Sequence, residues 1–266
     1  SQDITTVFLE HLAREGYVVL SGCLGEKDVD RARWLLWDYL EVSTAGLDDG
    51  KPQGLQQRDA QTWETNRGWP AEPDTGEIRR QGVGQSELLW HIRGLPRVQE
   101  AFARIWGTDW LLASFEGCAA FRPWGSRPGG REQWRPTESQ YWLAQASRWK
   151  RGPGLASVQG MVPLTDQTPR TGGLVVLPQS HLEHAELTRR LGNGSATATS
   201  TTSTTSTTSG GHLSGTAEGD PDQVVVPGDD PVFAKCGPPR LLECRAGDLV
   251  LWDSRTITGM TGAVEV

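Results

Sequence analysis

The first third of the chain repeats apolar residues with the period of an amphipathic helix. Within residues 3–15, Ile4, Phe8 and Leu12 recur at four-residue intervals, and Gly16 follows where the pattern stops. An apolar stripe of this spacing predicts a helix that packs one face against a core. The same reasoning predicts a strand over residues 17–20 and further helices over residues 26–42 and 96–106.

After Gly107 the pattern changes to short apolar runs bounded by Gly and Pro, which is typical of β-strands. Between the helices, residues 43–85 are rich in Gly, Pro, Gln and Asp and predict long loops. Helices come first and strands later, so we expect an α+β chain whose antiparallel sandwich or barrel is covered by helices on one face. Strands are predicted over residues 110–121, 140–147, 155–164, 173–178, 223–227, 240–244 and 248–253, with a further one at the C-terminal end.

One segment departs from this pattern. Residues 195–209 consist only of Ser, Thr and Ala and cannot bury apolar surface. A disordered surface insertion is therefore expected at about residues 192–219. We expect the chain as a whole, residues 1–266, to form a single domain with this insertion.

Composition and charge exclude several classes of protein. Hydrophobic residues make up 36% of the 266 residues and there are 32 glycines, which suits a globular chain. A net charge of -7 argues against a nucleic-acid partner. No apolar run approaches the about 20 residues of a membrane span, so no membrane partner is expected. The four cysteines are too far apart to indicate a zinc site or a disulfide framework, and a cytoplasmic location is the default.

Four short segments carry a recognisable combination of Gly, Pro, Asp, His and Arg: residues 16–20 (GYVVL), 157–166 (SVQGMVPLTD), 171–181 (TGGLVVLPQSH) and 246–256 (AGDLVLWDSRT). In order and spacing they resemble the phytanoyl-CoA dioxygenase family of non-haem iron, 2-oxoglutarate-dependent oxygenases. The resemblance implies a double-stranded β-helix, the cupin-like jelly roll of two sheets, with the N-terminal helices packed on one sheet.

In that family two His and one carboxylate bind Fe(II) and leave positions open for 2-oxoglutarate and oxygen. The resemblance places the family's His-x-Asp pair at Ala144 and Ala146, on one face of a strand, and its second His at Thr258. The family's 2-oxoglutarate-binding Arg would fall past Val266. We therefore expect no metal site, no catalytic residue of the family's kind and no cofactor, whereas the family uses Fe(II) and 2-oxoglutarate.

Other histidines are weaker metal candidates. Two His-x-carboxylate pairs occur, His181 with Glu183 and His184 with Glu186, and His212 could be imagined as a third ligand. The resemblance makes His181 a hydrogen-bonding residue at a strand end, and His212 lies in the predicted insertion. No metal site is predicted at these residues either.

A jelly roll encloses a cavity, and its lining would survive the loss of a metal. Arginine side chains there could hold a small carboxylate by paired hydrogen bonds, although Arg255 could instead form only an ion pair with Asp253. Tryptophans at the mouth could stack on a planar organic ligand. The candidate pocket residues are Glu116, Arg122, Ser157, Gln159, Arg255 and Thr258, with Trp124, Trp134, Trp142 and Trp149 at the mouth.

Three functions stay open on the sequence. The first is a metal-free family member that binds or regulates through a small molecule. The second is an active Fe(II)- and 2-oxoglutarate-dependent hydroxylase whose metal-binding residues lie at positions other than Ala144, Ala146 and Thr258. The third is a metal-independent isomerase or cyclase that uses the same cavity, with Glu116 or Asp253 as acid or base.

Overall fold

The computed structural model describes residues 4–45, 54–63, 69–71, 76–79, 82–114, 116–121, 142–145, 155–193 and 223–262. Its α-helices are α1 (Ile4–Glu15), α2 (Glu26–Thr44), α3 (Glu87–Gly94), α4 (Pro96–Trp106), α5 (His184–Asn193) and α6 (Pro231–Cys236). Short 3-10 helices are η1 (Ala60–Trp63), η3 (Val83–Gln85) and η5 (Ser180–Glu183). Among the described residues, no helix combines the length and the apolar composition that crossing a bilayer requires.

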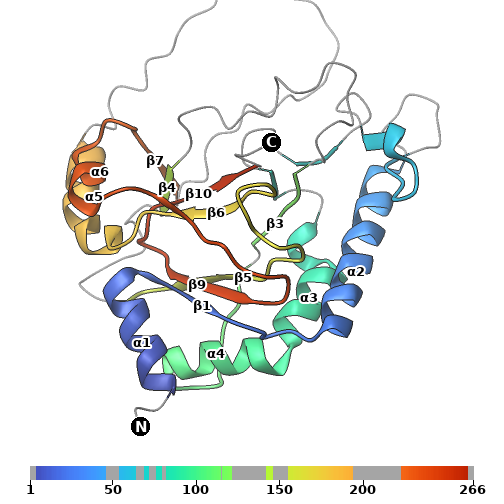
Figure 1. The fold of residues 1–266 in the computed structure, drawn as a ribbon, viewed down its shortest axis with the longest axis horizontal. Coiled ribbons are helices and arrows are strands. Elements are labelled where there is room, and N and C mark those ends of the chain that lie inside the picture. Colours follow the sequence, from blue (N-terminus) through green and yellow to red (C-terminus); the bar gives the residue numbers. More distant parts are fainter. Residues whose placement is uncertain are drawn as a thin grey trace, which may run out of the picture.

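The strands form two antiparallel sheets and a small ribbon (Figure 1). One sheet has the order β1-β9-β5, the other has the order β7-β4-β10-β6-β8, and β2 pairs with β3. The strand bounds are β1 (Tyr17–Leu20), β2 (Glu77–Ile78), β3 (Cys118–Ala119), β4 (Trp142–Gln145), β5 (Val158–Met161), β6 (Gly173–Val176), β7 (Gln223–Val226), β8 (Arg240–Leu241), β9 (Leu249–Asp253) and β10 (Thr258–Thr261).

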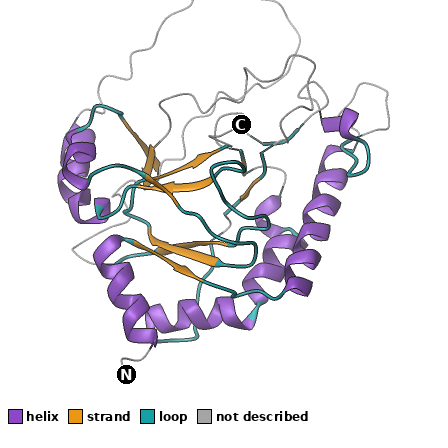
Figure 2. Ribbon diagram, in the orientation of Figure 1, coloured by secondary structure: helices purple, strands orange, loops and turns teal. Residues whose placement is uncertain are grey.

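The two sheets lie face to face, and helices α1 and α4 cover the outer face of the sheet β1-β9-β5 (Figures 1 and 2). Helices α2 and α3 flank this core on one side, and α5 and α6 flank it on the other. The fold is therefore α+β, a jelly roll of two sheets with N-terminal helices packed on one of them, as the sequence predicts.

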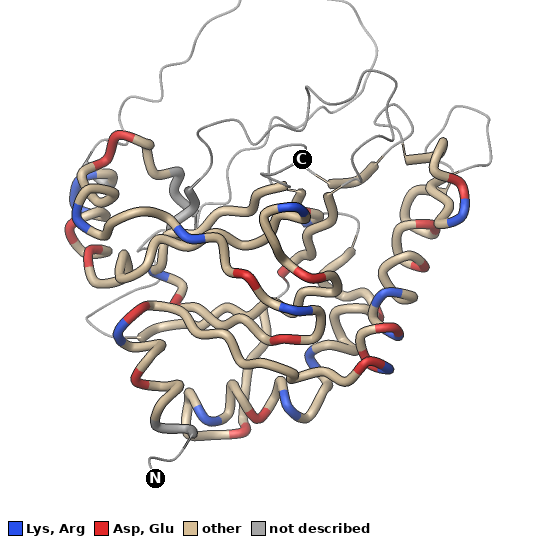
Figure 3. The backbone as a smooth tube through the Cα atoms, viewed as in Figure 1, with Lys and Arg blue, Asp and Glu red and all other residues tan. Residues whose placement is uncertain are grey.

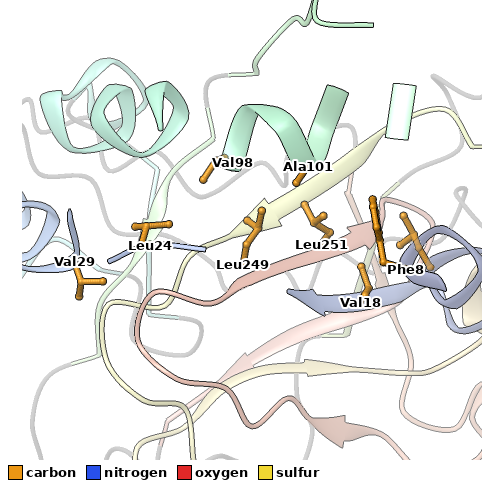
Figure 4. Close-up of a cluster of buried hydrophobic side chains, with 9 residues drawn as sticks. Phe8, Val18, Leu24, Val29, Val98, Ala101, Leu249 and Leu251 are labelled. Carbon is orange, nitrogen blue, oxygen red and sulfur yellow. The ribbon is translucent and has the colours of Figure 1, made fainter. Parts of the chain in front are cut away.

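The central strand β9 serves both faces of its sheet because its side chains alternate. Leu249 and Leu251 point to the helices, where they pack with Val98 and Ala101 of α4 (Figure 4). This helix-side cluster consists of Phe8, Leu12, Val18, Leu24, Val29, Val98, Ala101, Leu249 and Leu251.

Val250 and Trp252, the alternate residues of β9, point toward the second sheet. They belong to an inter-sheet cluster formed by Leu174, Val176, Leu242, Cys244, Val250 and Trp252, with Tyr17, Val19, Met161 and Met260 partly buried against it. Charged residues lie mainly on the helices and loops (Figure 3). The strands of the two sheets contain only Arg240 and Asp253 as charged residues, so the space between them is lined mainly by uncharged side chains.

Helices α5 and α6 pack together beside the second sheet. Leu187 of α5 and Val232 of α6 share a buried cluster with Val226 of β7. Arg190 donates to Asp230 at 2.6 Å, and Asp230 also accepts from the Val232 amide at 2.8 Å, which caps the start of α6.

Gly16 is the point where three of the four family-like segments meet. Its carbonyl accepts from the Asp253 amide at 2.9 Å and from Thr256 Oγ1 at 2.8 Å. A Cβ atom at this position would lie 2.5 Å from His181 Nδ1 and 2.6 Å from Thr256 Oγ1. With φ at +82°, the backbone is also in the left-handed region that favours glycine. A side chain at residue 16 would therefore both clash with His181 and Thr256 and strain the backbone.

Most predicted elements agree with the observed ones, and the exceptions have physical reasons. The strand predicted over residues 110–121 is wrong except at β3, because Trp110 and Leu112 stand exposed and only Cys118–Ala119 pairs with β2. Helix α3 was not predicted. It begins at Ser86, whose hydroxyl accepts from the Leu89 amide. Helices α5 and α6 were also missed, and residues 194–222, which contain most of the predicted insertion, lie outside the described residues.

We expect Gly16→Ala to lower the free energy of unfolding by about 3 kcal/mol, because it adds left-handed strain to a clash inside a close-packed junction. Urea denaturation followed by circular dichroism measures this change. Gly22→Ala is the matched control: Gly22 also has positive φ, at +63°, but nothing lies within 4 Å of the point that its Cβ would occupy. It should cost about 1 kcal/mol. Equal losses in the two variants would contradict the close approach at Gly16.

Candidate functional site

Thr258, which the sequence resemblance assigns to the family's second His, begins β10 and faces the space between the sheets. It is in register with Val176 of β6, a member of the inter-sheet cluster, and with Leu143 of β4. Residues directly opposite each other on antiparallel strands share a face, so Thr258 shares the inward face of Val176. Ala144 is the next residue of β4 and pairs with Val224 of β7. Positions 144 and 258 therefore lie on adjacent strands but one residue out of register: strand alternation places position 143, and not position 144, on the face of Thr258.

The predicted convergence of all three former metal positions stays a prediction, because Ala146 lies outside the described residues. The backbone that leads to Thr258 is nevertheless firmly held. The Ile257 amide donates to Ser180 Oγ at 2.8 Å, and the Ile257 carbonyl accepts from the Leu177 amide at 2.9 Å. Ile257 itself is fully buried. The strand thus starts at a fixed point of the fold.

Asp253 and Arg255 form a buried ion pair at the end of β9. Arg255 Nη2 donates to Asp253 Oδ2 at 2.6 Å and its Nε donates to Oδ1 at 2.9 Å, while the Arg255 amide donates to Oδ1 at 2.8 Å. The hydrogen bonds that Arg255 donates to the Asp253 carboxylate raise the pKa of Arg255. The carboxylate is occupied as an acceptor and the guanidinium is neutralised by it. This geometry matches the structural interpretation of Arg255, because its Nε and Nη2 are both used within the pair.

Gln159 lies on β5 opposite Trp252, on the inward face of the first sheet. Trp252 Nε1 donates to Gln159 Oε1 at 3.0 Å. Ser157, two residues earlier, is used by the fold: its hydroxyl donates to Ser254 Oγ at 2.5 Å, and Ser254 Oγ donates to the Ser157 carbonyl at 3.0 Å. Trp252 was missed as a site residue, although the alternation of apolar residues in residues 248–253 carried the signal that could have placed it inward.

The remaining candidates fall elsewhere. Glu116 is exposed, and its carboxylate accepts from Ser114 Oγ at 3.2 Å near the start of β3. Trp142 lies in β4, where only the backbone is described. The residues that lie outside the described part of the chain are Arg122, Trp124, Trp134, Ala146, Trp149 and His212.

The two His-x-carboxylate pairs serve the fold. His181 is buried and its Nε2 donates to the Ala13 carbonyl at 3.0 Å, since a carbonyl only accepts. Glu183 is bound by Lys235 at 2.8 Å, and Glu186 by Arg189 at 2.6 Å. Within the described ranges, no group of three or more His, Cys, Asp and Glu side chains is arranged to hold a metal ion.

All four cysteines are free, and burial raises the pKa of each thiol. The pKa rises to about 12 for Cys118 and to about 11 for Cys244, where nearby Asp248 and Asp166 add to the effect of burial. A thiol is nucleophilic only as thiolate, so none of the four has the lowered pKa of a catalytic cysteine.

A family model described as phytanoyl-CoA dioxygenase (PhyH) matches residues 12–259. Ava biosynthesis cluster protein O from Aspergillus versicolor is 31% identical over 122 residues, which cover 46% of this chain and 36% of that protein. The match thus spans about a third of that relative's length.

Solved structures with a similar course of the chain include SnoK, described as a non-heme alpha ketoglutarate dependent carbocyclase from nogalamycin biosynthesis. It is 14% identical with a TM-score of 0.49, covering 99% of this chain and 80% of that one. AviO1 from Streptomyces viridochromogenes Tue57 is 13% identical with a TM-score of 0.49, covering 100% of this chain and 90% of that one.

Asp253→Asn should lower the free energy of unfolding by about 3 kcal/mol, because it leaves the Arg255 guanidinium half-buried without its counter-charge. Chemical denaturation measures the loss. Glu100→Gln is the control, since it breaks the exposed pair of Glu100 with Arg104 and should cost less than about 1 kcal/mol. A tolerated Asp253→Asn would mean that Arg255 is not held by this pair.

The thiol pKa values predict a loss of stability in alkali. An unfolded thiol ionises near pH 9, whereas Cys118 in the fold ionises only near 12, so the free energy of unfolding should fall as the pH rises above 9. Urea midpoints measured between pH 8 and pH 10.5 test this, with Cys118→Ser as the control in which the slope becomes shallower. Rapid alkylation of Cys118 in the native protein at pH 8 would contradict the raised pKa.

Proposed function

Because the chain belongs to the phytanoyl-CoA dioxygenase family, we propose that it is a metal-free member that binds an organic molecule without oxidising it. The observation that carries the proposal is the identity of the residues at the three positions that the sequence resemblance assigns to the family's metal ligands, Ala144, Ala146 and Thr258. A methyl group has no electron pair to give a metal. A neutral threonine hydroxyl is a far weaker ligand than the imidazole that the family uses there.

The surroundings of Thr258 support the same conclusion. Its neighbours on the inward face are Val176 and Met260, which offer apolar contact and no nitrogen or oxygen donor. The residues present at and beside Thr258 therefore do not fit an Fe(II) ion.

The proposal also depends on the two sheets that would enclose a bound molecule. The two facing sheets, the buried support beneath β9 and the fixed start of β10 are all present, so loss of the ligands has not been accompanied by loss of the scaffold. The inward face still carries hydrogen-bonding side chains beside apolar ones, which is the mixture that small-molecule sites use.

Metal binding tests the proposal directly. The chain should give no thermal shift and no calorimetric heat with Mn(II), a redox-inert substitute for Fe(II), at concentrations up to about 1 mM, whether or not 2-oxoglutarate is present. It should also leave 2-oxoglutarate undecarboxylated in the presence of Fe(II) and ascorbate. Micromolar binding of Mn(II), or turnover of 2-oxoglutarate, would instead establish an active oxygenase with ligands at other positions.

The triple variant Ala144→His, Ala146→Asp, Thr258→His provides the matched gain-of-function control. The register of Leu143 against Thr258 leaves positions 144 and 258 one residue apart. If β4 shifts by that residue so that the three positions converge, the variant should bind Mn(II) at least about 100-fold more tightly than the unmodified chain, because it gains two imidazoles and one carboxylate. A folded triple variant that still fails to bind metal would overturn the assignment of these positions.

A further inference from the structure

The side-chain amide of Gln159 has a fixed orientation. The indole N–H of Trp252 can only donate, so the group it contacts at 3.0 Å must be the amide oxygen of Gln159. This contact removes the usual ambiguity between the oxygen and nitrogen ends of an amide. The opposite end, Nε2 with its two N–H donors, is engaged by no other described residue. Trp252 thus holds Gln159 as a donor for some further group.

The free donor lies at an accessible part of the space between the sheets. Gln159 and Met161 of β5 are only partly buried, and so are Thr258 and Met260 of β10 on the facing sheet. Trp252 beneath them is buried in the inter-sheet cluster. Inward positions that keep partial solvent access on both sheets, next to a buried apolar cluster, are suited to receiving a molecule.

The electrostatics of this region favour an uncharged occupant. The one charged residue of the first sheet, Asp253, is neutralised by Arg255 in a bidentate pair. Arg240, which the register places opposite Val176, lies exposed on the edge strand β8. A carboxylate placed beside Gln159 would therefore lose its hydration without gaining a buried, unpaired cation from the described strands of the two sheets. An oxygen that accepts a hydrogen bond without carrying charge has no such cost.

We propose that Gln159 is the ligand-selecting residue of the inter-sheet site: its Nε2 donates to a carbonyl or ether oxygen of an uncharged, mainly apolar molecule. The body of that molecule packs against Met161 and Met260, and Trp252 positions the donor. This inference rests on the proposed function, since it takes the site to be a binding site without a metal. It replaces the carboxylate ligand expected from the sequence with an uncharged one.

A fluorescent ketone tests the inference. The probe 6-propionyl-2-dimethylaminonaphthalene is neutral and planar, and its emission shifts to the red when its carbonyl accepts a hydrogen bond. The unmodified chain should bind it saturably, as measured by anisotropy. Gln159→Glu keeps an oxygen for Trp252 but loses both N–H donors, so affinity should fall about tenfold and the bound emission should move to the blue.

A second glutamine accepts a hydrogen bond from a tryptophan at the surface and provides a matched control. Gln85 Oε1 accepts from Trp90 Nε1 at 3.1 Å, so Gln85→Glu makes the same change in the same kind of pair outside the site. It should leave probe binding unchanged. Gln159→Met, which is uncharged and similar in volume, covers the case in which Gln159→Glu fails to fold, and it should show the same tenfold loss.

The outcomes separate this inference from the proposed function. Absence of probe binding, or binding by Gln159→Glu and Gln159→Met equal to that of the unmodified chain, overturns the role of Gln159 while the metal-free assignment stands. Tighter binding of the anionic probe 1-anilinonaphthalene-8-sulfonate than of the ketone overturns the uncharged ligand class. Micromolar Mn(II) binding by the unmodified chain overturns the proposed function whatever the ketone does.

Discussion

The absence of a side chain at residue 16 is the constraint on which the rest of the structure depends. Helix α1 ends there, β1 begins there, and the turn after β9 and the turn after β6 both reach the same point. His181 and Thr256 occupy the volume that any Cβ would need. The junction therefore couples four elements that are distant in sequence, and it places the start of β10 through the neighbouring residues Ser180 and Ile257.

Strand β9 packs against the helices with one set of side chains and faces the space between the sheets with the other. Every residue of the strand is buried, yet alternate side chains belong to different layers. The helix side can be filled by packing alone, with Leu249 and Leu251 against α4. The opposite side carries Trp252, whose indole adds a directional hydrogen bond to the apolar contact. A family member can therefore change what its inward face binds without disturbing the packing that holds the sheet, because the two tasks fall on different residues.

The sequence predicted those parts that are encoded locally. The stripe of Ile4, Phe8 and Leu12 located α1, and Pro96 located the start of α4. Helix α3 was not predicted because its apolar residues fall on several sides of a short helix and form no regular stripe. The helix depends instead on a serine cap and on packing against α2. The strand expected around Trp110 failed because alternation alone does not supply a partner strand. The candidate site shows the same division. The hydrogen bond between Trp252 and Gln159 spans 93 positions and depends on the register of β5 against β9, which no local pattern contains.

The packing of α5 against α6 has a consequence for how the family's chains can vary. Helix α5 ends at Asn193, and Gln223 begins strand β7, which leads to α6. The apolar cluster shared by α5 and α6 and the ion pair between Arg190 and Asp230 therefore hold together the two ends of the stretch between Asn193 and Gln223. Closing a longer loop adds little entropic cost, since each doubling of its length adds only about 0.6 kcal/mol. The number of residues between Asn193 and Gln223 should therefore have little effect on the stability of the fold, so this connection can differ in length between chains that share the same sheets.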